Sequence, residues 1–268
     1  MANDQTTTRR VKVALRSPEP VVAAAVDPNS GSIYTLQRRR GGEQQGHLIL
    51  SKWARHGTAM DFMYLYGFGT GTSLCIEPTT IGPAVWISSR STKDSGFDRA
   101  VSRFHYRANG SLTFGDAAAR VFKLSSSPAT TAVSVDADAD RVLLRFASNK
   151  AVDYGLFGLQ DLLDGSTTPL SRFTAVDEDP KRVNRSVLLS GERVYSLAQS
   201  LLEGRMSWAL DAYDLDGIPG EAKTADRSRA PRGPATEPVG LAQAAQPGLT
   251  ELIGIARSGQ VALTFSSV

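Results

Sequence analysis

The sequence contains one cysteine and three histidines, which excludes much of the chemistry that depends on these residues. A single cysteine, Cys75, cannot form a disulfide within the chain, and this agrees with a reducing compartment. His47, His56 and His105 lack the spacing of metal ligands, so we expect no metal site. Cys75 lies in an apolar, strand-like run, and we interpret it as a small buried thiol rather than a reactive one.

Long apolar runs are also missing from the sequence. No run approaches the roughly 18 to 20 consecutive apolar residues that a membrane helix needs, so we expect no membrane span. The first residues, MANDQTTTRRVKVALRS, are polar where a secretion signal requires an apolar stretch. We therefore expect a cytoplasmic protein as encoded, or one released by a non-classical or phage-like route.

The charge is only mildly basic, with a formal net charge of +3 and a pI near 9.1. Arginines cluster at Arg9–Arg10, at Arg38–Arg40 and within residues 227–232. Such clusters can touch nucleic acid or anionic glycan, but no basic stripe alternates with aromatic residues as single-strand binders require. We interpret them as solvated loop charge and expect no specific nucleic-acid partner.

The glycine-rich motifs of nucleotide-binding enzymes are absent as well. A Walker loop ends in Gly-Lys-Ser/Thr and leads into a helix, whereas the segment GFGTGT, residues 67–72, leads into a strand-like run. No strand–glycine–helix unit and no Gly-x-Ser-x-Gly elbow occurs, so we expect no cofactor. We interpret Gly67, Gly69 and Gly71 as the crossing from the outer strand of one repeat to the inner strand of the next.

The sequence does contain a repeated strand–turn–strand pattern. VVAAAVDPNSGSIYTLQ is one copy and TTAVSVDADADRVLLRFA is another, and five copies recur at roughly 50-residue intervals, each followed by further strands. This pattern predicts an all-β protein that is a single five-bladed β-propeller over residues 1–268, in which small residues let the innermost strands crowd around the axis. The predicted blades are 19–66, 72–124, 130–178, 184–229 and 237–268. We expect an N-terminal strand, residues 10–16, to join the last blade and close the ring.

Several motifs carry a family resemblance along nearly the whole chain. AVDPNSGSIYTLQ, LSKW, MYLYGFGTGTSLCIEP, VWISSR, RFHYRANGSL and TEPVGLA resemble the blade motifs of helveticin-like bacteriocins and of related receptor-binding propellers from phage tails and a teichoic-acid-associated bacterial protein. Two departures stand out. Thr70 replaces the histidine of that family's Gly-His-Gly turn, and its Glu-Pro-Glu-Gly motif here has Val239 in place of the second glutamate. If the missing side chains contact a ligand in that family, this chain has changed that contact.

Carboxylates on inner strands could serve as an acid and base pair, as in propeller glycosidases. Glu77 and Glu237 fall at comparable inner-strand positions of different blades, and Asp61 and Asp153 are further candidates. The alternative is that each acid is tied to a neighbouring arginine or to backbone amides.

Propeller function usually lies in the funnel at one end of the axis, where polar and aromatic side chains from several blades converge. The predicted ligand-binding residues are Glu77, Trp86, Arg90, Asn184, Arg185 and Glu237, with Arg90 and Arg185 expected close to Glu77. Ring faces and charged groups of this kind suit a sugar or another polar ligand, although tryptophans can equally pack between blades. The leading hypothesis is a monomeric recognition propeller that binds a cell-envelope glycan or small polar ligand. The alternatives are a glycan-cleaving or biosynthetic enzyme and a protein-interaction scaffold.

Overall fold

The structure is a computed structural model that describes residues 8–90, 98–124, 130–148, 150–175, 183–202, 205–219, 236–243, 250–258 and 260–267. Strands make up nearly all of its regular structure, and within these residues the one helix is α1 (Leu159–Asp164). No helix in the described part of the chain is long and apolar enough to cross a membrane.

The strands form five sheets. Sheet 1 holds β2 (Val21–Val26), β3 (Ile33–Arg38), β4 (Leu48–Trp53), β5 (Ala59–Tyr66) and β9 (Ser111–Thr113). Sheet 2 holds β6 (Leu74–Glu77), β7 (Ala84–Ser89), β8 (Ala100–His105) and β10 (Arg120–Phe122). Sheet 3 holds β11 (Thr130–Asp136), β12 (Arg141–Ala147), β13 (Val152–Gly158) and β14 (Ser171–Ala175). Sheet 4 holds β15 (Val183–Ser190), β16 (Arg193–Leu202) and β17 (Arg205–Asp214), and sheet 5 holds β18 (Thr236–Gln243), β19 (Thr250–Ser258), β20 (Gln260–Ser267) and β1 (Thr8–Lys12).

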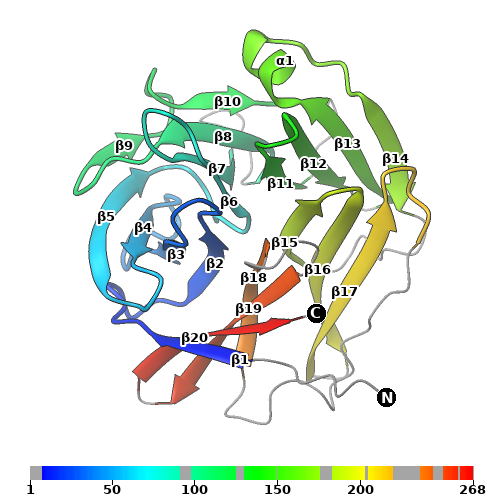
Figure 1. Ribbon diagram of the computed structural model, residues 1–268. Coiled ribbons are helices and arrows are strands. Elements are labelled where there is room, and N and C mark those ends of the chain that lie inside the picture. Colours follow the sequence, from blue (N-terminus) through cyan, green and yellow to red (C-terminus); the bar gives the residue numbers. More distant parts are fainter. Residues whose placement is uncertain are drawn as a thin grey trace.

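The sheets stand around a central axis, with the first strand of each repeat innermost (Figure 1). Along the chain, β2 contacts β6, β6 contacts β11, β11 contacts β15 and β15 contacts β18, while β18 also contacts β2. This arrangement is a β-propeller, as the repeated strand pattern predicts.

Serine side chains connect successive inner strands. The Ser73 hydroxyl accepts a hydrogen bond from the backbone N–H of Val133 at 3.0 Å. Ser134 accepts one from Leu189 at 2.9 Å, and Ser186 accepts one from the backbone N–H of Leu241 at 3.1 Å. Neighbouring inner strands belong to different sheets, so these side chains satisfy backbone donors that no strand ladder reaches.

The approach of β18 to β2 is closer still. A Cβ atom on Gly240 would lie 2.1 Å from the carbonyl oxygen of Ala24, so only glycine fits there without moving the backbone. At this position a larger side chain would push β18 and β2 apart.

Three details differ from the sequence-based expectation. The N-terminal strand is β1, Thr8–Lys12, rather than 10–16, and it pairs antiparallel with β20, as the blue and red strands in Figure 1 show. β9 pairs in parallel with β5 and so belongs to sheet 1, not to the repeat that surrounds it in sequence. Helix α1 was not expected, because six residues are too few to show helical periodicity.

Candidate functional site

The strand register of sheet 2 separates two ends of the propeller. Glu77, the last residue of β6, pairs with Ala84 at the start of β7. Leu74 at the start of β6 pairs with Ile87, close to the end of β7. We call the end where residues 67–72 lead into β6 the glycine-turn end, and the opposite end the Glu77 end.

Glu77 is a buried carboxylate that is fully engaged by neighbouring side chains. Its side chain accepts hydrogen bonds from Arg103 at both oxygens, at 2.7 Å to Oε2 and 2.8 Å to Oε1. The indole N–H of Trp86 donates to Oε2 at 2.6 Å. Glu77 is only 4% exposed. This bidentate pair is the arrangement expected of an acid tied to a neighbouring arginine.

The two tryptophans predicted near a rim are both packed inside the propeller. Trp86 is 0% exposed and stacks on Phe122, with ring centroids 5.2 Å apart. Trp53 is 1% exposed, and its indole N–H donates to the hydroxyl of Thr35 at 2.9 Å. Their role in the structure is packing between sheets.

Arg90 lies at the other end from Glu77. It directly follows β7, six residues beyond the Ala84 that pairs with Glu77, which corresponds to about 20 Å along an extended strand. Its guanidinium donates to the carbonyl oxygen of Gln45 at 3.4 Å. The expectation that Arg90 lies close to Glu77 is therefore wrong, because the length of β7 separates the two residues.

The remaining candidates lie on inner strands β15 and β18. Asn184 occupies a β-bulge and donates to the carbonyl oxygen of Ser186 at 3.3 Å, while its Oδ1 is buried without a hydrogen-bond partner. Arg185 follows it in β15 and Glu237 is the second residue of β18, but the side chains of both lie outside the described part of the structure. Glu237 begins its strand whereas Glu77 ends its own, so the expectation that they hold comparable positions is wrong.

The other two acids considered for catalysis are engaged in side-chain hydrogen bonds. Asp61 accepts a hydrogen bond from the hydroxyl of Tyr106, and Asp153 accepts one from the hydroxyl of Thr174 at 2.6 Å. Among the described residues, no group of three or more His, Cys, Asp and Glu side chains could hold a metal ion.

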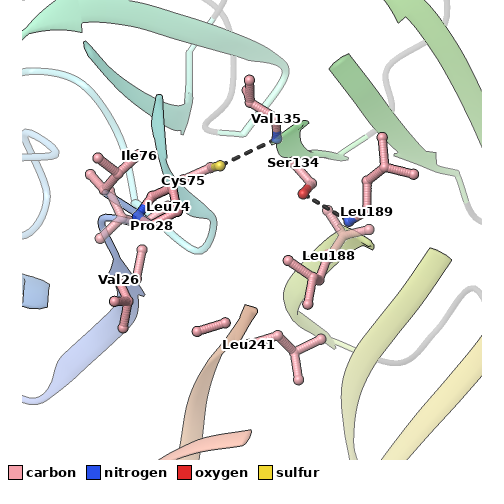
Figure 2. A pocket seen from close by; sticks show the side chains of 13 residues that line it. Val26, Pro28, Leu74, Cys75, Ile76, Ser134, Val135, Leu188, Leu189 and Leu241 are labelled. Atoms are coloured by element: carbon pink, nitrogen blue, oxygen red, sulfur yellow. Dashed lines mark hydrogen bonds between the residues drawn. The ribbon is translucent and has the colours of Figure 1, made fainter. Parts of the chain in front are cut away.

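A cavity of about 50 Å³ lies on the axis and is lined by residues from all five inner strands, as Figure 2 shows. Its walls are mostly apolar. Cys75 contributes its thiol, which accepts a hydrogen bond from the backbone N–H of Val135 at 3.3 Å, and burial raises the pKa of this thiol to about 12. Pockets for small-molecule ligands usually hold about 300 to 1,000 Å³, so a sugar ring does not fit here. None of the candidate site residues is among the described residues that line it.

A second buried carboxylate, Asp98, lies at the glycine-turn end. It has a positive φ of 59° and is 8% exposed. The hydroxyl of Thr70 donates to its Oδ2, while Oδ1 is buried without a hydrogen-bond partner. Burial raises the pKa of Asp98, and hydrogen bonds from nearby hydroxyls only partly offset this. Asp98 is not among the residues predicted from the sequence, although its partner Thr70 departs from the Gly-His-Gly turn of the family that the chain resembles.

A histidine side chain also binds the glycine turn, residues 67–72. His47 accepts a hydrogen bond at Nδ1 from the backbone N–H of Gly67 at 3.0 Å, so the other ring nitrogen carries the proton when the ring is neutral. Burial, together with the positive charges of Arg39 and Arg90, lowers the pKa of His47. The ring of Tyr66 meets the His47 ring edge-to-face, with centroids 5.2 Å apart.

Aromatic side chains continue from this point along β5. Phe62, Tyr64 and Tyr66 alternate with the buried Met63 and Leu65, so the three rings share the half-exposed face. The signal in the sequence is the alternation of aromatic and apolar residues in DFMYLY, whereas its proximity to Arg39 appears only in the structure.

Aromatic faces, guanidinium groups and hydrogen-bonding side chains thus meet at the glycine-turn end. The guanidinium of Arg39 lies above the rings of Tyr64 and Tyr66, at 5.1 and 5.3 Å from their centroids. Such an arrangement can stack on a sugar or bind the hydroxyl and acidic groups of a polar ligand. We define the candidate site as Arg39, His47, Tyr64, Tyr66 and Arg90, with Thr70 and Asp98 behind the glycine turn.

Comparison with known proteins supports the fold. No family model and no curated protein sequence matches this chain. Among solved structures, the tail fiber of Staphylococcus aureus phage P68 is similar over 100% of this chain and 53% of its own, with a TM-score of 0.69 and 13% identity. This chain thus spans about half the length of that tail fiber chain. The catalytic domain of the Coprinopsis cinerea GH62 alpha-L-arabinofuranosidase is similar over 98% of both chains, with a TM-score of 0.54 and 11% identity. At these identities the similarity shows a shared propeller fold.

Proposed function

We propose that this protein is a recognition propeller that binds a cell-envelope glycan or a similar polar ligand, as a bacteriocin-like or phage-tail-like protein does. The observation that carries the proposal is the candidate site, where the half-exposed rings of Tyr64 and Tyr66 lie beside Arg39 and the Tyr66 ring also meets His47. A propeller of the same fold in a phage tail fiber is consistent with receptor binding.

Recognition is favoured over hydrolysis because the predicted acid pair is not assembled. Glu77 has both oxygens occupied by Arg103 and Trp86, and the backbone of Glu237 belongs to the beginning of its strand rather than the end. A general acid must reach the reacting group within hydrogen-bond distance, which a buried and fully paired carboxylate does not do. Direct ligand contacts by Glu77, Asn184, Arg185 and Glu237 remain predictions.

We also propose that the five sheets are the blades of one closed ring and that the chain belongs to the helveticin-like family. The order of contacts among the inner strands and the pairing of β1 with β20 support the ring, and the quoted motifs support the family. A monomer, cytoplasmic as encoded and released by a non-classical or phage-like route, fits this proposal.

The proposal is tested by binding to an array of bacterial cell-wall glycans, with the same glycans analysed afterwards for cleavage. We expect binding without product, and an affinity that falls about tenfold or more in Tyr64→Ala, taking as a guide the roughly 1 to 3 kcal/mol that a nucleobase gains by stacking on an aromatic side chain. Phe173→Ala is the matched control, since Phe173 is also a half-buried aromatic on an outer strand, in sheet 3. Its affinity should be unchanged. Cleaved glycan would favour an enzymatic function. An equal loss of affinity in Tyr64→Ala and Phe173→Ala would contradict the proposed location of the site.

A further inference from the structure

The glycine turn is bound on one side to the buried acid Asp98. The hydroxyl of Thr70, in the middle of the turn, donates to the carboxylate of Asp98. The backbone of Asp98 is fixed by another element, because its carbonyl oxygen accepts from the backbone N–H of Thr131 in β11 at 2.7 Å. The turn joins sheet 1 to sheet 2, so Thr70 attaches it to a residue that is tied to sheet 3.

On its other side the turn is bound to the loop between β3 and β4, residues 39–47, which carries part of the candidate site. The backbone N–H of Gly67 donates to Nδ1 of His47 at 3.0 Å. The backbone N–H of Gly69 donates to the carbonyl oxygen of Gly46 at 3.2 Å. The position of the His47 ring thus depends on the conformation of the glycine turn.

Asp98 is surrounded mainly by hydroxyl groups. Those of Thr70, Thr72 and Ser88 lie close to its carboxylate, and the positive charge of Arg38 also acts on it. Burial raises the pKa of Asp98 more than these groups lower it. The contact with Thr70 is therefore the hydrogen bond that joins this acid to the turn.

His47 is subject to several charges of its own. Burial and the positive charges of Arg39 and Arg90 lower its pKa. Glu43 lies in the same loop, where its Oε1 accepts a hydrogen bond from the backbone N–H of Gly41 at 3.1 Å. Nδ1 of His47 can accept a hydrogen bond only while it carries no proton, so the bond from the turn also favours the neutral ring. The pKa of His47 therefore reports how firmly the turn is held against the ring.

We infer that Thr70 and Asp98 are positioning residues of the candidate site, which hold the glycine turn in the conformation that binds the ring of His47 beside Tyr66. They act through the turn rather than by touching the ligand. The inference rests on the proposed function for the existence of a ligand at this end of the propeller. It adds that the affinity depends on a hydrogen bond behind the binding surface.

The test is an NMR pH titration of the three histidines in the full chain, which requires no ligand. Thr70→Val preserves the shape of the side chain and removes the hydroxyl, so the turn loses its bond to Asp98. We expect the pKa of His47 to rise by about 0.3 or more towards its usual 6.5, because a weaker bond from Gly67 no longer favours the neutral ring. Thr70→Ser keeps the hydroxyl and should retain the wild-type pKa. The exposed His56 should not respond to either change.

A second variant and a matched control complete the titration. Asp98→Gly removes the acceptor, and glycine suits the positive φ of this position. It should also raise the pKa of His47, whereas loss of a negative charge alone would lower it. Thr79→Val is the control, because the Thr79 hydroxyl also binds a turn, by donating to the carbonyl oxygen of Gly82 at the Glu77 end. It should leave the pKa of His47 unchanged.

The inference is overturned if the pKa of His47 stays at its wild-type value in folded Thr70→Val and Asp98→Gly, or if Thr79→Val raises it equally. Binding of the same variants to the glycan array separates this inference from the proposed function. A raised pKa together with weaker glycan binding in Thr70→Val supports both. A raised pKa in a protein that binds no glycan would keep the coupling between Asp98 and His47 and remove the proposed function.

Discussion

Glu77 and Asp98 are two buried carboxylates at opposite ends of the propeller, and their surroundings differ in one decisive respect. Glu77 is bound by a guanidinium at both oxygens and by an indole N–H, so its negative charge is fully paired. Asp98 receives a hydroxyl hydrogen bond from Thr70, one of its oxygens has no partner, and burial raises its pKa.

The comparison teaches that burial alone does not reveal what an acid does. A paired carboxylate fixes the packing of its sheet, and breaking the pair leaves a buried charge. An incompletely paired one destabilises its own charged form, and groups of that kind gather at functional sites. We therefore propose that the pair at the Glu77 end stabilises the fold and that ligand binding belongs to the glycine-turn end.

The largest expected effect on stability comes from replacing Glu77. Glu77→Ala leaves the guanidinium of Arg103 and the indole N–H of Trp86 without their partner, and we expect a loss of about 3 kcal/mol in the free energy of unfolding. Urea unfolding measures it. The double variant Glu77→Gln with Arg103→Met should recover part of the loss, because no unpaired charge remains. A loss below about 1 kcal/mol in Glu77→Ala would mean that the pair does not hold the sheet.

Asp98→Asn should change the stability less, and by an amount that depends on pH. Because the folded pKa of Asp98 lies above its ordinary value of 3.8, the folded state keeps a proton that the unfolded chain has lost. The stability of the wild-type protein should therefore fall relative to Asp98→Asn as the pH rises from 3.8 through the raised folded pKa. Thermal unfolding of both proteins between pH 4 and 8 measures this difference. A gap that shrinks as the pH rises would show that Asp98 is stabilised as a carboxylate, like Glu77.

His47→Ala should have the smallest effect on stability, about 1 kcal/mol, because it removes the acceptor for one backbone N–H. The folded pKa of His47 lies below its usual 6.5, so its contribution is present above pH 6.5 and is lost as the pH falls through the folded pKa. The wild-type protein and the variant should thus converge in acid. His56→Ala, at an exposed histidine, is the control and should change nothing.

The sequence predicts the fold better than the site. Alternating apolar residues and turns mark the inner strands of the repeats, and a small residue is required where two inner strands approach closely, as at Gly240 beside Ala24. The site depends on contacts between segments far apart in sequence. The contact of Gln45 with Arg90 joins sheets 1 and 2, the contact of Thr70 with Asp98 joins the glycine turn to the segment before β8, and no spacing in the sequence predicts either contact.

The start and end of each strand explain why Glu77 and Glu237 do not hold comparable positions. Glu-Pro occurs at the end of the segment TSLCIEP and at the start of TEPVGLAQ, so the same dipeptide lies at the last residue of β6 and the second of β18. A motif shared by two repeats does not fix a shared position unless the strands begin at the same residue. For the tryptophans, the sequence left both ligand contact and packing between sheets open, and in the structure both side chains are buried.

The most direct test compares one variant from each end in two measurements, the affinity for a cell-envelope glycan and the free energy of unfolding. The account predicts that Glu77→Gln loses stability and, below its unfolding transition, binds with the affinity of the wild-type protein. Arg39→Gln should keep its stability and lose most of its affinity. The opposite pattern, in which Glu77→Gln stays stable but loses binding or turnover while Arg39→Gln binds normally, would contradict the account and place the site at the Glu77 end.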